Sequence, residues 1–293
     1  MTDIVLLDGG MGQELLLRAP EEPTALWATQ VMLNHPGLVA AIHEDYFASG
    51  ATIATTNTYA IHHDRLVGTK QEGRLLDLLN LALAEAQSSI SSPSQKIAGS
   101  IGPLVATYRP DTHPDLETAV PAYAEIAKHI ASSVDLILCE TVASVIHAEA
   151  ILTGARQTNL PVWLSVTLDD EDGSRLRSGE PVSALSHLTP DAWLANCSAP
   201  EVMQTGLEVF ATFGRPFGAY ANGFREITKD FLKAKPTADA LSAREDVTPQ
   251  AYADTVMEWI AQGATIVGGC CEIGPAHIKQ IATRLTAAGH RIV

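Results

Sequence analysis

The feature that most constrains the fold is a regular alternation of short apolar runs with longer segments of helical spacing. Eight apolar runs are bounded by Gly, Pro or polar residues and read as strands. They cover residues 4–8, 52–57, 96–101, 134–140, 162–168, 192–197, 217–222 and 264–269. The helical segments between them include residues 35–50, 72–90, 117–133 and 248–263. The first of these segments ends at Gly50 and the last at Gly263, as expected because glycine often terminates a helix.

Strict alternation of strand and helix implies a parallel sheet, because parallel neighbours need a crossover connection. Eight such units predict a closed (β/α)8 TIM barrel, and a doubly wound open sheet is the alternative. No linker-like or low-complexity tract divides the chain, so we expect residues 1–293 to form one domain. The longest irregular segments are residues 91–95 and 233–246.

Chemically capable side chains stand at or just beyond the ends of nearly all the predicted strands. They are Asp8, Asn57, Ser100, Glu140, Asp169, Cys197, Asn222, Cys270 and Cys271. Because active sites of parallel barrels form at the carboxyl ends of the strands, this pattern predicts one shared site.

Charge and hydropathy restrict the partners. A net charge of -15 without a basic patch argues against nucleic acid and anionic membranes, which would repel the chain. The start, MTDIVLLDGG, lacks the basic and long apolar regions of a signal peptide, and no apolar run approaches the roughly 18 residues of a membrane span. We therefore expect a cytoplasmic protein with small-molecule partners, and a homo-oligomer is compatible with the sequence.

Three of the four cysteines are predicted to meet. Four cysteines are too few for a disulfide framework in a chain of 293 residues, so reduced thiols are expected. Cys197 ends the sixth strand, while Cys270 and Cys271 end the eighth. Three thiolates without a nearby ligand histidine suit zinc and leave a fourth position open for a ligand. The alternative is that these are small buried residues, and spacing alone does not decide between the two.

The neighbours of the thiols are interpreted from their positions. Cys139 lies on the opposite pleat from Glu140 and is predicted to belong to the core. Gly268 and Gly269 are expected to let the backbone pass close to the metal and its sulfurs. The ten histidines, including His62 and His63, form no metal-binding pattern and are interpreted as surface or capping groups.

Seven segments carry a resemblance to a known family. They are LLDGGMGQEL, LWATQVMLNHPGLVAAIHEDYFASGATIATTNTYA, GSIGP, LCETVAS, NCSAP, YANGF and GGCCEIGPAHI. In these segments the chain resembles the homocysteine S-methyltransferase family, which includes S-methylmethionine-dependent enzymes and betaine-homocysteine methyltransferase. The resemblance implies a zinc-dependent TIM barrel in which Cys197, Cys270 and Cys271 hold zinc and the homocysteine sulfur takes the open position. That sulfur would accept a methyl group from a sulfonium or ammonium donor, giving methionine.

The resemblance also implies how homocysteine is held. The glutamate of LCETVAS, Glu140, would bind the ammonium group; otherwise it is a carboxylate near a helix N-terminus. Asp8, Gly9 and Gly10 form the first strand-to-loop turn, where backbone N–H groups would meet the carboxylate and Asp8 would join the ammonium network. The alternative for Asp8 is a tight turn with a self-satisfied aspartate.

The donor side is expected to be aromatic. Trp27 and Tyr59 align with aromatic residues on the donor side of related enzymes, and a π-face attracts an onium cation; Trp27 is otherwise a helix-packing residue. Asn222 would support the metal region or satisfy backbone groups. Arg109 would meet a donor carboxylate or lie solvated in its loop.

The predicted activity is zinc-dependent methyl transfer to homocysteine from a sulfonium donor, either S-methylmethionine or S-adenosylmethionine. One alternative is a betaine-homocysteine methyltransferase, and another is a zinc-binding paralogue without turnover. The chain lacks the extra domains expected of cobalamin- and folate-dependent methionine synthases, and it has no separate nucleotide-binding fold for S-adenosylmethionine. Its sequence departs from the family's most common motif sequence at GGMGQELLLRAPEEP and at YANGF, so the resemblance does not specify the donor.

Overall fold

The computed structural model describes residues 1–19, 26–224 and 243–293, apart from the side chain of Trp27. Residues 233–242 of the predicted irregular segment 233–246 therefore lie outside the described residues. The strands are β1 (Asp3–Leu6), β2 (Ile53–Thr55), β3 (Lys96–Ile101), β4 (Leu136–Val142), β5 (Val162–Val166), β6 (Ala192–Asn196), β7 (Phe217–Tyr220), β8 (Ile266–Val267) and β9 (Arg291–Ile292).

The strands close into a barrel. Their order is β2-β3-β4-β5-β6-β7-β8-β1-β9, and the paired strands β1 and β8, like β2 and β3, run parallel. A parallel bridge between Leu7 and Ile53 joins the two ends of the eight-stranded sheet. The Asp8 amide donates to Ile53 O at 3.1 Å, and the Thr52 amide donates to Leu6 O at 2.7 Å. The predicted (β/α)8 barrel is thus confirmed.

A ninth strand, which the sequence did not predict, extends the sheet beside the start of β1. Arg291 pairs with Asp3 in the ladder, and the Arg291 guanidinium also forms an ion pair with the Asp3 carboxylate. Because β9 uses only the first half of β1, the end of β1 remains free to meet β2. The C-terminal strand therefore does not interrupt the barrel.

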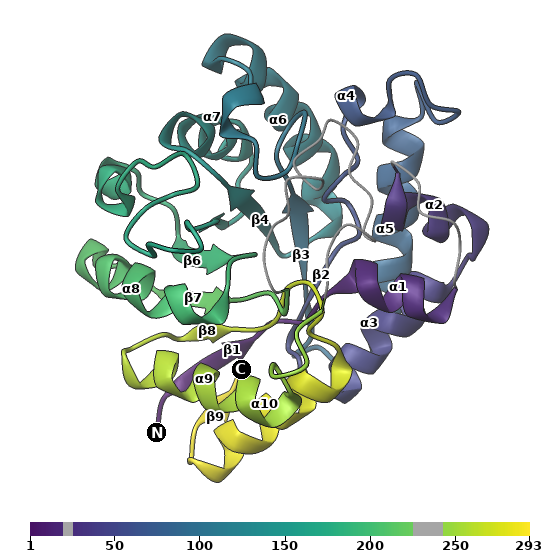
Figure 1. The fold of residues 1–293 in the computed structure, drawn as a ribbon. Helices are drawn as coiled ribbons and strands as arrows, with labels where there is room; N and C mark the ends of the chain where they lie inside the picture. Colours follow the sequence, from purple (N-terminus) through teal and green to yellow (C-terminus); the bar gives the residue numbers. More distant parts are fainter. Residues whose placement is uncertain (20–25, 225–242) are drawn as a thin grey trace.

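Helices form a ring around the strands (Figure 1). They are α1 (Met11–Arg18), α2 (Trp27–Asn34), α3 (Leu38–Ala48), α4 (His63–Leu66), α5 (Leu75–Ser88), α6 (Leu116–Ile130), α7 (Val145–Ala155), α8 (Pro200–Phe210), α9 (Pro249–Ala261) and α10 (Pro275–Ala287), with 3-10 turns η1 (Pro110–Thr112), η2 (Ala131–Ser133), η3 (Val182–His187) and η4 (Ala211–Phe213). Side-chain caps start several of them: Asp115 accepts from Thr118 N, and Ser144 accepts from His147 N. Gly50 and Gly263 follow helices with φ of 108° and 104°, as the sequence predicts for helix ends.

The core has two layers. The larger cluster lies between the sheet and the helices and includes Trp193, Trp259 and Cys139, which is fully buried as predicted. A smaller cluster fills the barrel interior with side chains from successive strands, among them Leu7, Leu138 and Ile266. Because the interior is packed, the space for a ligand is expected at the carboxyl ends of the strands.

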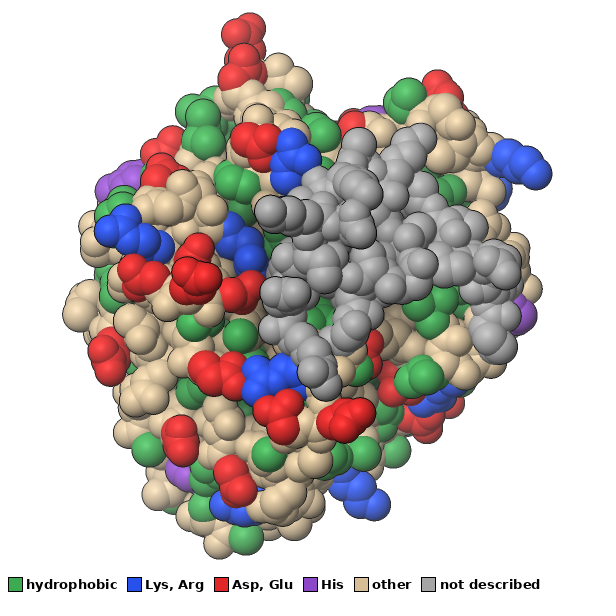
Figure 2. Space-filling model, viewed as in Figure 1, with side chains coloured by type: hydrophobic (Ala, Val, Ile, Leu, Met, Phe, Trp, Pro, Cys, Tyr) green, Lys and Arg blue, Asp and Glu red, His purple; other side chains and the backbone are tan. Residues whose placement is uncertain are grey.

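Acidic and basic side chains are interspersed on the face shown in Figure 2. Across residues 1–19, 26–224 and 243–293, none of the helices has the length and apolar character to cross a bilayer.

The prediction that the histidines are surface or capping groups is wrong in part, because His43, His62 and His147 are at most 1% exposed. Of these three, His147 does act at a helix start, where its Nδ1 accepts from Ala143 N at 3.2 Å. His62 packs edge-on against Tyr123, and His147 stacks on His113 with ring centroids 4.4 Å apart. Burial lowers the pKa of His43 and of His62 from 6.5 to about 4 and lowers the pKa of His147 well below its ordinary value. These rings are therefore neutral parts of the packed structure at neutral pH.

Such histidines make stability depend on pH. A histidine whose pKa is lowered by folding binds its proton more readily in the unfolded chain, so its contribution is complete above pH 6.5 and is lost towards pH 4. Asp8 acts in the opposite direction, since burial raises its pKa from 3.8 to about 7 and stability is lost as pH rises through that window. Burial also raises the pKa of Glu140, which therefore acts as Asp8 does. The three histidines outnumber these two carboxylates, so we expect a net loss of stability on acidification from pH 6.5.

Replacing His62 with Gln should flatten this acid loss. The amide can still donate to Tyr59 O, which the ring nitrogen reaches at 3.1 Å, but it cannot bind the proton. The slope of unfolding free energy against pH should fall by up to about 1.4 kcal/mol per pH unit below pH 6.5, measured by urea unfolding. His63→Gln is the matched control, because the neighbouring His63 is exposed and pairs with Glu125. Equal flattening by both variants would contradict the role of burial.

Candidate active site

A cavity of about 200 Å³ opens at the carboxyl ends of the strands. It is lined by residues that follow or end β1, β2, β4, β6, β7 and β8. Ten of the residues singled out from the sequence line it: Asp8, Gly9, Gly10, Asn57, Tyr59, Glu140, Cys197, Gly269, Cys270 and Cys271. Side chains that are more than 200 positions apart in sequence therefore face one space.

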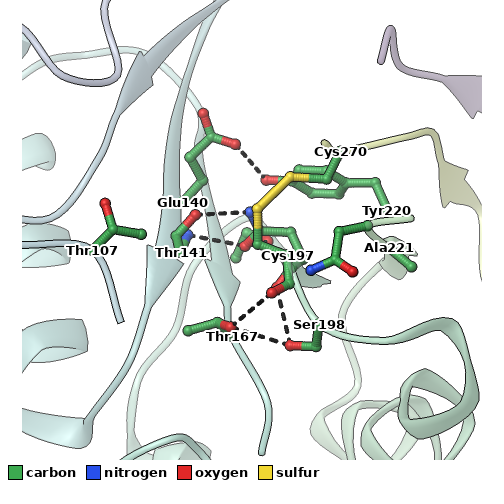
Figure 3. The surroundings of a disulfide bond; sticks show 12 residues. Thr107, Glu140, Thr141, Thr167, Cys197, Ser198, Tyr220, Ala221 and Cys270 are labelled. Carbon is green, nitrogen blue, oxygen red and sulfur yellow. Dashed lines mark hydrogen bonds between the residues drawn. A yellow bond between two sulfur atoms is a disulfide. The ribbon is translucent and has the colours of Figure 1, made fainter. Parts of the chain in front are cut away.

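The three predicted thiol ligands lie together, with their sulfur atoms within 4.8 Å of one another. Two of them, Cys197 and Cys270, form a disulfide (Figure 3), while the thiol of Cys271 is free. The expectation of reduced thiols is thus wrong for this pair, because the Cα atoms are only 5.8 Å apart, well within reach of a disulfide. Since a thiolate is the form that binds metal, a metal would require the pair to be reduced.

The sulfur cluster suits a soft or borderline metal ion. Three sulfurs at about 2.3 Å from one ion stand roughly 4 Å apart, which the observed spacing allows. Burial raises the pKa of the Cys271 thiol to about 12, so this thiol stays protonated at neutral pH unless a cation compensates its charge. Both observations indicate a site that a metal ion would complete.

Glycines bring the first and last loops into contact at this site. A Cβ on Gly9 would stand 2.0 Å from Ile273 O, and one on Gly10 would stand 2.8 Å from Cys270 O. The close approach predicted for Gly268 and Gly269 has another cause than the sulfurs: their nearest neighbours are Leu7 Cβ and Ile273 Cγ2. These glycines let the β8 loop pack against β1 and against its own turn.

The Gly10 amide is already occupied, since it donates to Ile273 O at 2.9 Å. The Gly9 amide makes no such bond to the described residues. Of the two amides predicted to meet a substrate carboxylate, Gly9 is therefore the one available.

Glu140 lies within β4 and points across the barrel (Figure 3). It accepts hydrogen bonds from the Ser100 hydroxyl and from the Tyr220 hydroxyl, the latter at 3.0 Å. Burial raises its pKa, and the two hydroxyl bonds counter that effect. Because α7 begins only at Val145, the alternative of a helix N-terminal carboxylate does not describe this position.

The backbone beside Glu140 and Cys197 is held in an unusual conformation. Thr141 and Cys197 have φ of 60° and 52°, in the left-handed region that non-glycine residues rarely adopt. The buried Asn196 clamps this place, accepting from Thr141 N at 2.9 Å and donating to Thr141 Oγ1 at 3.0 Å. Strained positions of this kind gather at functional sites, where the surroundings maintain them.

Asp8 is the second buried carboxylate. It accepts from Thr55 N at 2.6 Å and from Thr55 Oγ1 at 2.8 Å, and His43 Nδ1 lies 3.9 Å away. Desolvation raises its pKa to about 7; the Thr55 bonds lower the pKa, and the charge of Glu140 raises it. The neutral His43 does not compensate the charge of Asp8.

The two carboxylates give the cavity one negatively charged end. Neither Asp8 nor Glu140 forms an ion pair with a described Lys or Arg, and their hydrogen-bond donors are neutral. A buried carboxylate without a cation is costly, and a bound ammonium group would relieve that cost. The arrangement is suited to a ligand that carries a positive charge near the sulfur cluster.

Aromatic side chains form another part of the wall. Tyr59 donates to or accepts from Thr107 Oγ1 at 3.1 Å, and Tyr108 and Tyr220 also line the cavity. Trp27 begins α2, but its side chain lies outside the described residues. Three tyrosines thus line the cavity, and a donor-binding role for Trp27 and Tyr59 stays a prediction.

Two predicted residues lie apart from the cavity lining. Asn222 is buried, and its side-chain oxygen accepts from Phe224 N at 3.2 Å, so it organises its own turn. Arg109 pairs with Asp111 through two bonds of 2.7 and 2.6 Å. Asn222 therefore satisfies a backbone group, which is the second of the two roles predicted for it. Arg109 is already paired with a carboxylate of the protein, that of Asp111.

Sequence reasoning missed Tyr220, Asn196 and Arg65. Tyr220 and Asn196 stand inside the matched segments YANGF and NCSAP, but as strand residues they gave no separate signal. Ser100 was noted at a strand end without a role, and its bond to Glu140 shows the role.

Comparison with known proteins shows that the chain is similar to homocysteine S-methyltransferases. A family model described as "Homocysteine S-methyltransferase" matches residues 5–285. The homocysteine S-methyltransferase YbgG of Bacillus subtilis is 24% identical over 305 residues, covering 95% of this chain and 93% of the relative. The homocysteine S-methyltransferase of Escherichia coli is 28% identical over 309 residues, covering 96% of this chain and 95% of the relative.

A solved structure agrees with the fold. The metallated form of the homocysteine methyltransferase MmuM from Escherichia coli superimposes with a TM-score of 0.81 at 24% identity, covering 97% of this chain and 96% of that chain. At this identity the likeness supports the architecture.

Proposed function

Because this chain belongs to the homocysteine S-methyltransferase family, we propose that it transfers a methyl group from a sulfonium donor, S-methylmethionine or S-adenosylmethionine, to the sulfur of homocysteine. The observation that carries the proposal is the shared cavity, in which three cysteine sulfurs and two buried carboxylates face one space. Homocysteine offers a thiol for the first group and an ammonium for the second.

The proposed cofactor is zinc, held by Cys197, Cys270 and Cys271 as thiolates. The all-sulfur donor set and its spacing fit this ion, and three protein ligands leave one position open for a substrate. The related Escherichia coli protein has been solved in a metallated form. When bound, zinc supplies a positive charge that lowers the pKa of a substrate thiol, so that a thiolate exists at neutral pH.

The chain's own residues would fix the two substrates. Glu140, held by Ser100 and Tyr220, and Asp8, held by Thr55, would bind the ammonium group of homocysteine and so place its sulfur at the cysteine cluster. The aromatic wall would hold the onium donor by cation–π attraction. The new S–CH3 bond forms as the donor's S–CH3 bond breaks, and the electron pair of the broken bond stays on the donor sulfur.

Two alternatives make different demands on the site. A betaine donor would use the same aromatic wall, so the aromatics do not exclude it. A zinc-binding paralogue without turnover would not need two buried carboxylates facing the cavity, and both are present. Because residues from Asp8 to Cys271 build one site, we also propose that residues 1–293 act as one domain.

The proposed donor class predicts a substrate preference. Reduced, zinc-loaded protein should form methionine from homocysteine with S-methylmethionine at least about tenfold better in kcat/KM than with betaine, a difference of about 1.4 kcal/mol. The measurement is methionine formed with each donor under matched conditions. A preference for betaine would overturn the donor assignment, and zinc-loaded protein that turns over no donor would support the paralogue.

A further inference from the structure

The described wall of the cavity contains one basic side chain, Arg65, which has no role in the function proposed above. Arg65 lies in α4, on the loop side of the barrel that also carries Tyr59. Its Nη2 donates to Pro103 O at 3.0 Å and to Thr107 Oγ1 at 3.2 Å. Its Nε is buried without an acceptor. The Nε–H of the Arg65 guanidinium is therefore available to donate a hydrogen bond to a ligand.

Arg65 differs from other arginines near this end of the barrel in lacking a carboxylate. Arg109 pairs with Asp111 and Arg177 with Asp170, whereas both acceptors of Arg65 are neutral oxygens and no described carboxylate lies within ion-pair distance. A guanidinium is shaped to bind a carboxylate through two hydrogen bonds. In a cavity wall, the missing carboxylate is one that a ligand would bring.

Arg65 lies beside the Tyr59 ring, on which Glu140 also acts electrostatically. The guanidinium carbon is 5.9 Å from the centroid of the Tyr59 ring, and Thr107 Oγ1 links the Tyr59 hydroxyl to Arg65 Nη2. Burial raises the pKa of Tyr59 to about 12; the charge of Arg65 lowers it and that of Glu140 raises it. The cavity wall thus carries two buried carboxylates as well as a cationic group beside Tyr59.

We propose that Arg65 binds the carboxylate of the methyl donor and selects donors that carry an amino-acid head. The inference rests on the proposed methyl transfer and narrows its second substrate. Homocysteine would use the two buried carboxylates, and the donor would place its onium centre on the aromatic wall with its carboxylate at Arg65. This role replaces the one that the sequence suggested for Arg109.

The length of the donor agrees with this placement. In S-methylmethionine the carboxylate carbon is four bonds from the sulfonium, a reach of about 5 Å, whereas in betaine it is two bonds from the nitrogen, about 2.5 Å. A cation attracted by Tyr59 sits within about 6 Å of the ring centroid. With the onium centre at the aromatic wall, a carboxylate four bonds away reaches further toward Arg65 than a carboxylate two bonds away.

The test compares two donors in the wild-type protein and in two variants of Arg65. Arg65→Gln retains amide donors for Pro103 O and Thr107 Oγ1 but removes the charge, and Arg65→Lys restores the charge. The donors are S-methylmethionine and its decarboxylated analogue, (3-aminopropyl)dimethylsulfonium. Arg65→Gln should lower kcat/KM for S-methylmethionine by about 10- to 100-fold, the range for losing a charge-assisted bond. The analogue should change less than about threefold, because it has no carboxylate to lose, and Arg65→Lys should recover part of the loss.

Controls separate this inference from its premise. Arg74→Gln removes an exposed arginine that contacts Gln71 and Asp77 and should leave both donors unchanged. Equal losses with both donors, or a larger loss in Arg109→Gln than in Arg65→Gln, would overturn the inference, as would weakened homocysteine binding in Arg65→Gln. Calorimetric binding of S-methylmethionine alone gives a readout that does not need turnover. If wild-type protein forms no methionine yet binds S-methylmethionine through Arg65, the proposed reaction fails and the carboxylate site stands.

Discussion

Cys271→Ala should remove the metal and the activity together. Wild-type protein purified under reducing conditions and loaded with zinc should carry about one zinc per chain, as a single site requires. With two thiols left, the variant should carry less than about a tenth of that content, and methionine formation should fall on the order of 10³-fold or more, since the metal is worth several kcal/mol. Elemental analysis and a methionine assay measure the two quantities.

Cys271 is the most informative of the three positions. It is the free thiol of the cluster, so its removal leaves the Cys197–Cys270 pair and the rest of the packed site in place. Cys139→Ala is the matched control, because Cys139 is fully buried in the core cluster and should keep the zinc content unchanged. Zinc and activity retained in Cys271→Ala would show that the three sulfurs do not form the metal site.

Local pattern predicted the barrel because each strand and helix carries its own periodicity, and parallel strands with helical crossovers leave few arrangements. The sequence predicts strands that are longer than those observed. Residues 217–222 are predicted as a strand, but β7 ends at Tyr220, and the Asn222 amide donates a hydrogen bond to Ser198 O. Strand β9 could not be predicted, since its two residues are defined only by pairing with Asp3 at the other end of the chain. The local periodicity of hydrophobic residues does not predict contacts between segments that are distant in the sequence.

In the candidate site, too, the groups that stand out in the local sequence were predicted, and those defined by contacts between distant segments were not. The thiols and carboxylates were visible because such groups are unusual at the ends of apolar strands. Tyr220 and Arg65 were not visible in the sequence. A strand tyrosine becomes interpretable only once its hydroxyl lies 3.0 Å from Glu140, and the arginine of α4 only once no carboxylate among the described residues pairs with it. The burial of His62 beside the exposed His63 depends in the same way on where α6 places Tyr123.

Glu140→Gln should weaken homocysteine binding by about 1.5 to 3 kcal/mol, roughly ten- to a hundredfold in Kd, because it removes a charge-assisted contact to the ammonium group. The amide occupies nearly the same volume, and its carbonyl oxygen can still accept from the Ser100 or the Tyr220 hydroxyl. Zinc content should not change. Calorimetric titration of zinc-loaded protein with homocysteine measures the affinity.

Glu85→Gln is the matched control. Glu85 is also a buried carboxylate with two hydrogen bonds, but it accepts from Gly37 N and Ala40 N at the start of α3, away from the cavity. Its replacement should lower stability without changing the homocysteine affinity. Comparable loss of affinity in both variants would mean that any buried charge change disturbs the site.

A second readout distinguishes a binding role for Glu140 from a structural one. Burial raises the pKa of Asp8 to about 7, and the charge of Glu140 raises it as well, so removing that charge should lower the pKa of Asp8. If deprotonated Asp8 shares the ammonium group, homocysteine affinity in the wild type rises as pH increases through about 7, and in Glu140→Gln this rise should occur at lower pH. Above both midpoints, where Asp8 is deprotonated in both proteins, Glu140→Gln should still bind homocysteine more weakly, because the contact to the ammonium group is lost. A merely structural glutamate would shift the midpoint through its charge but leave this high-pH affinity unchanged. Unchanged affinity above both midpoints would therefore remove Glu140 from the binding site.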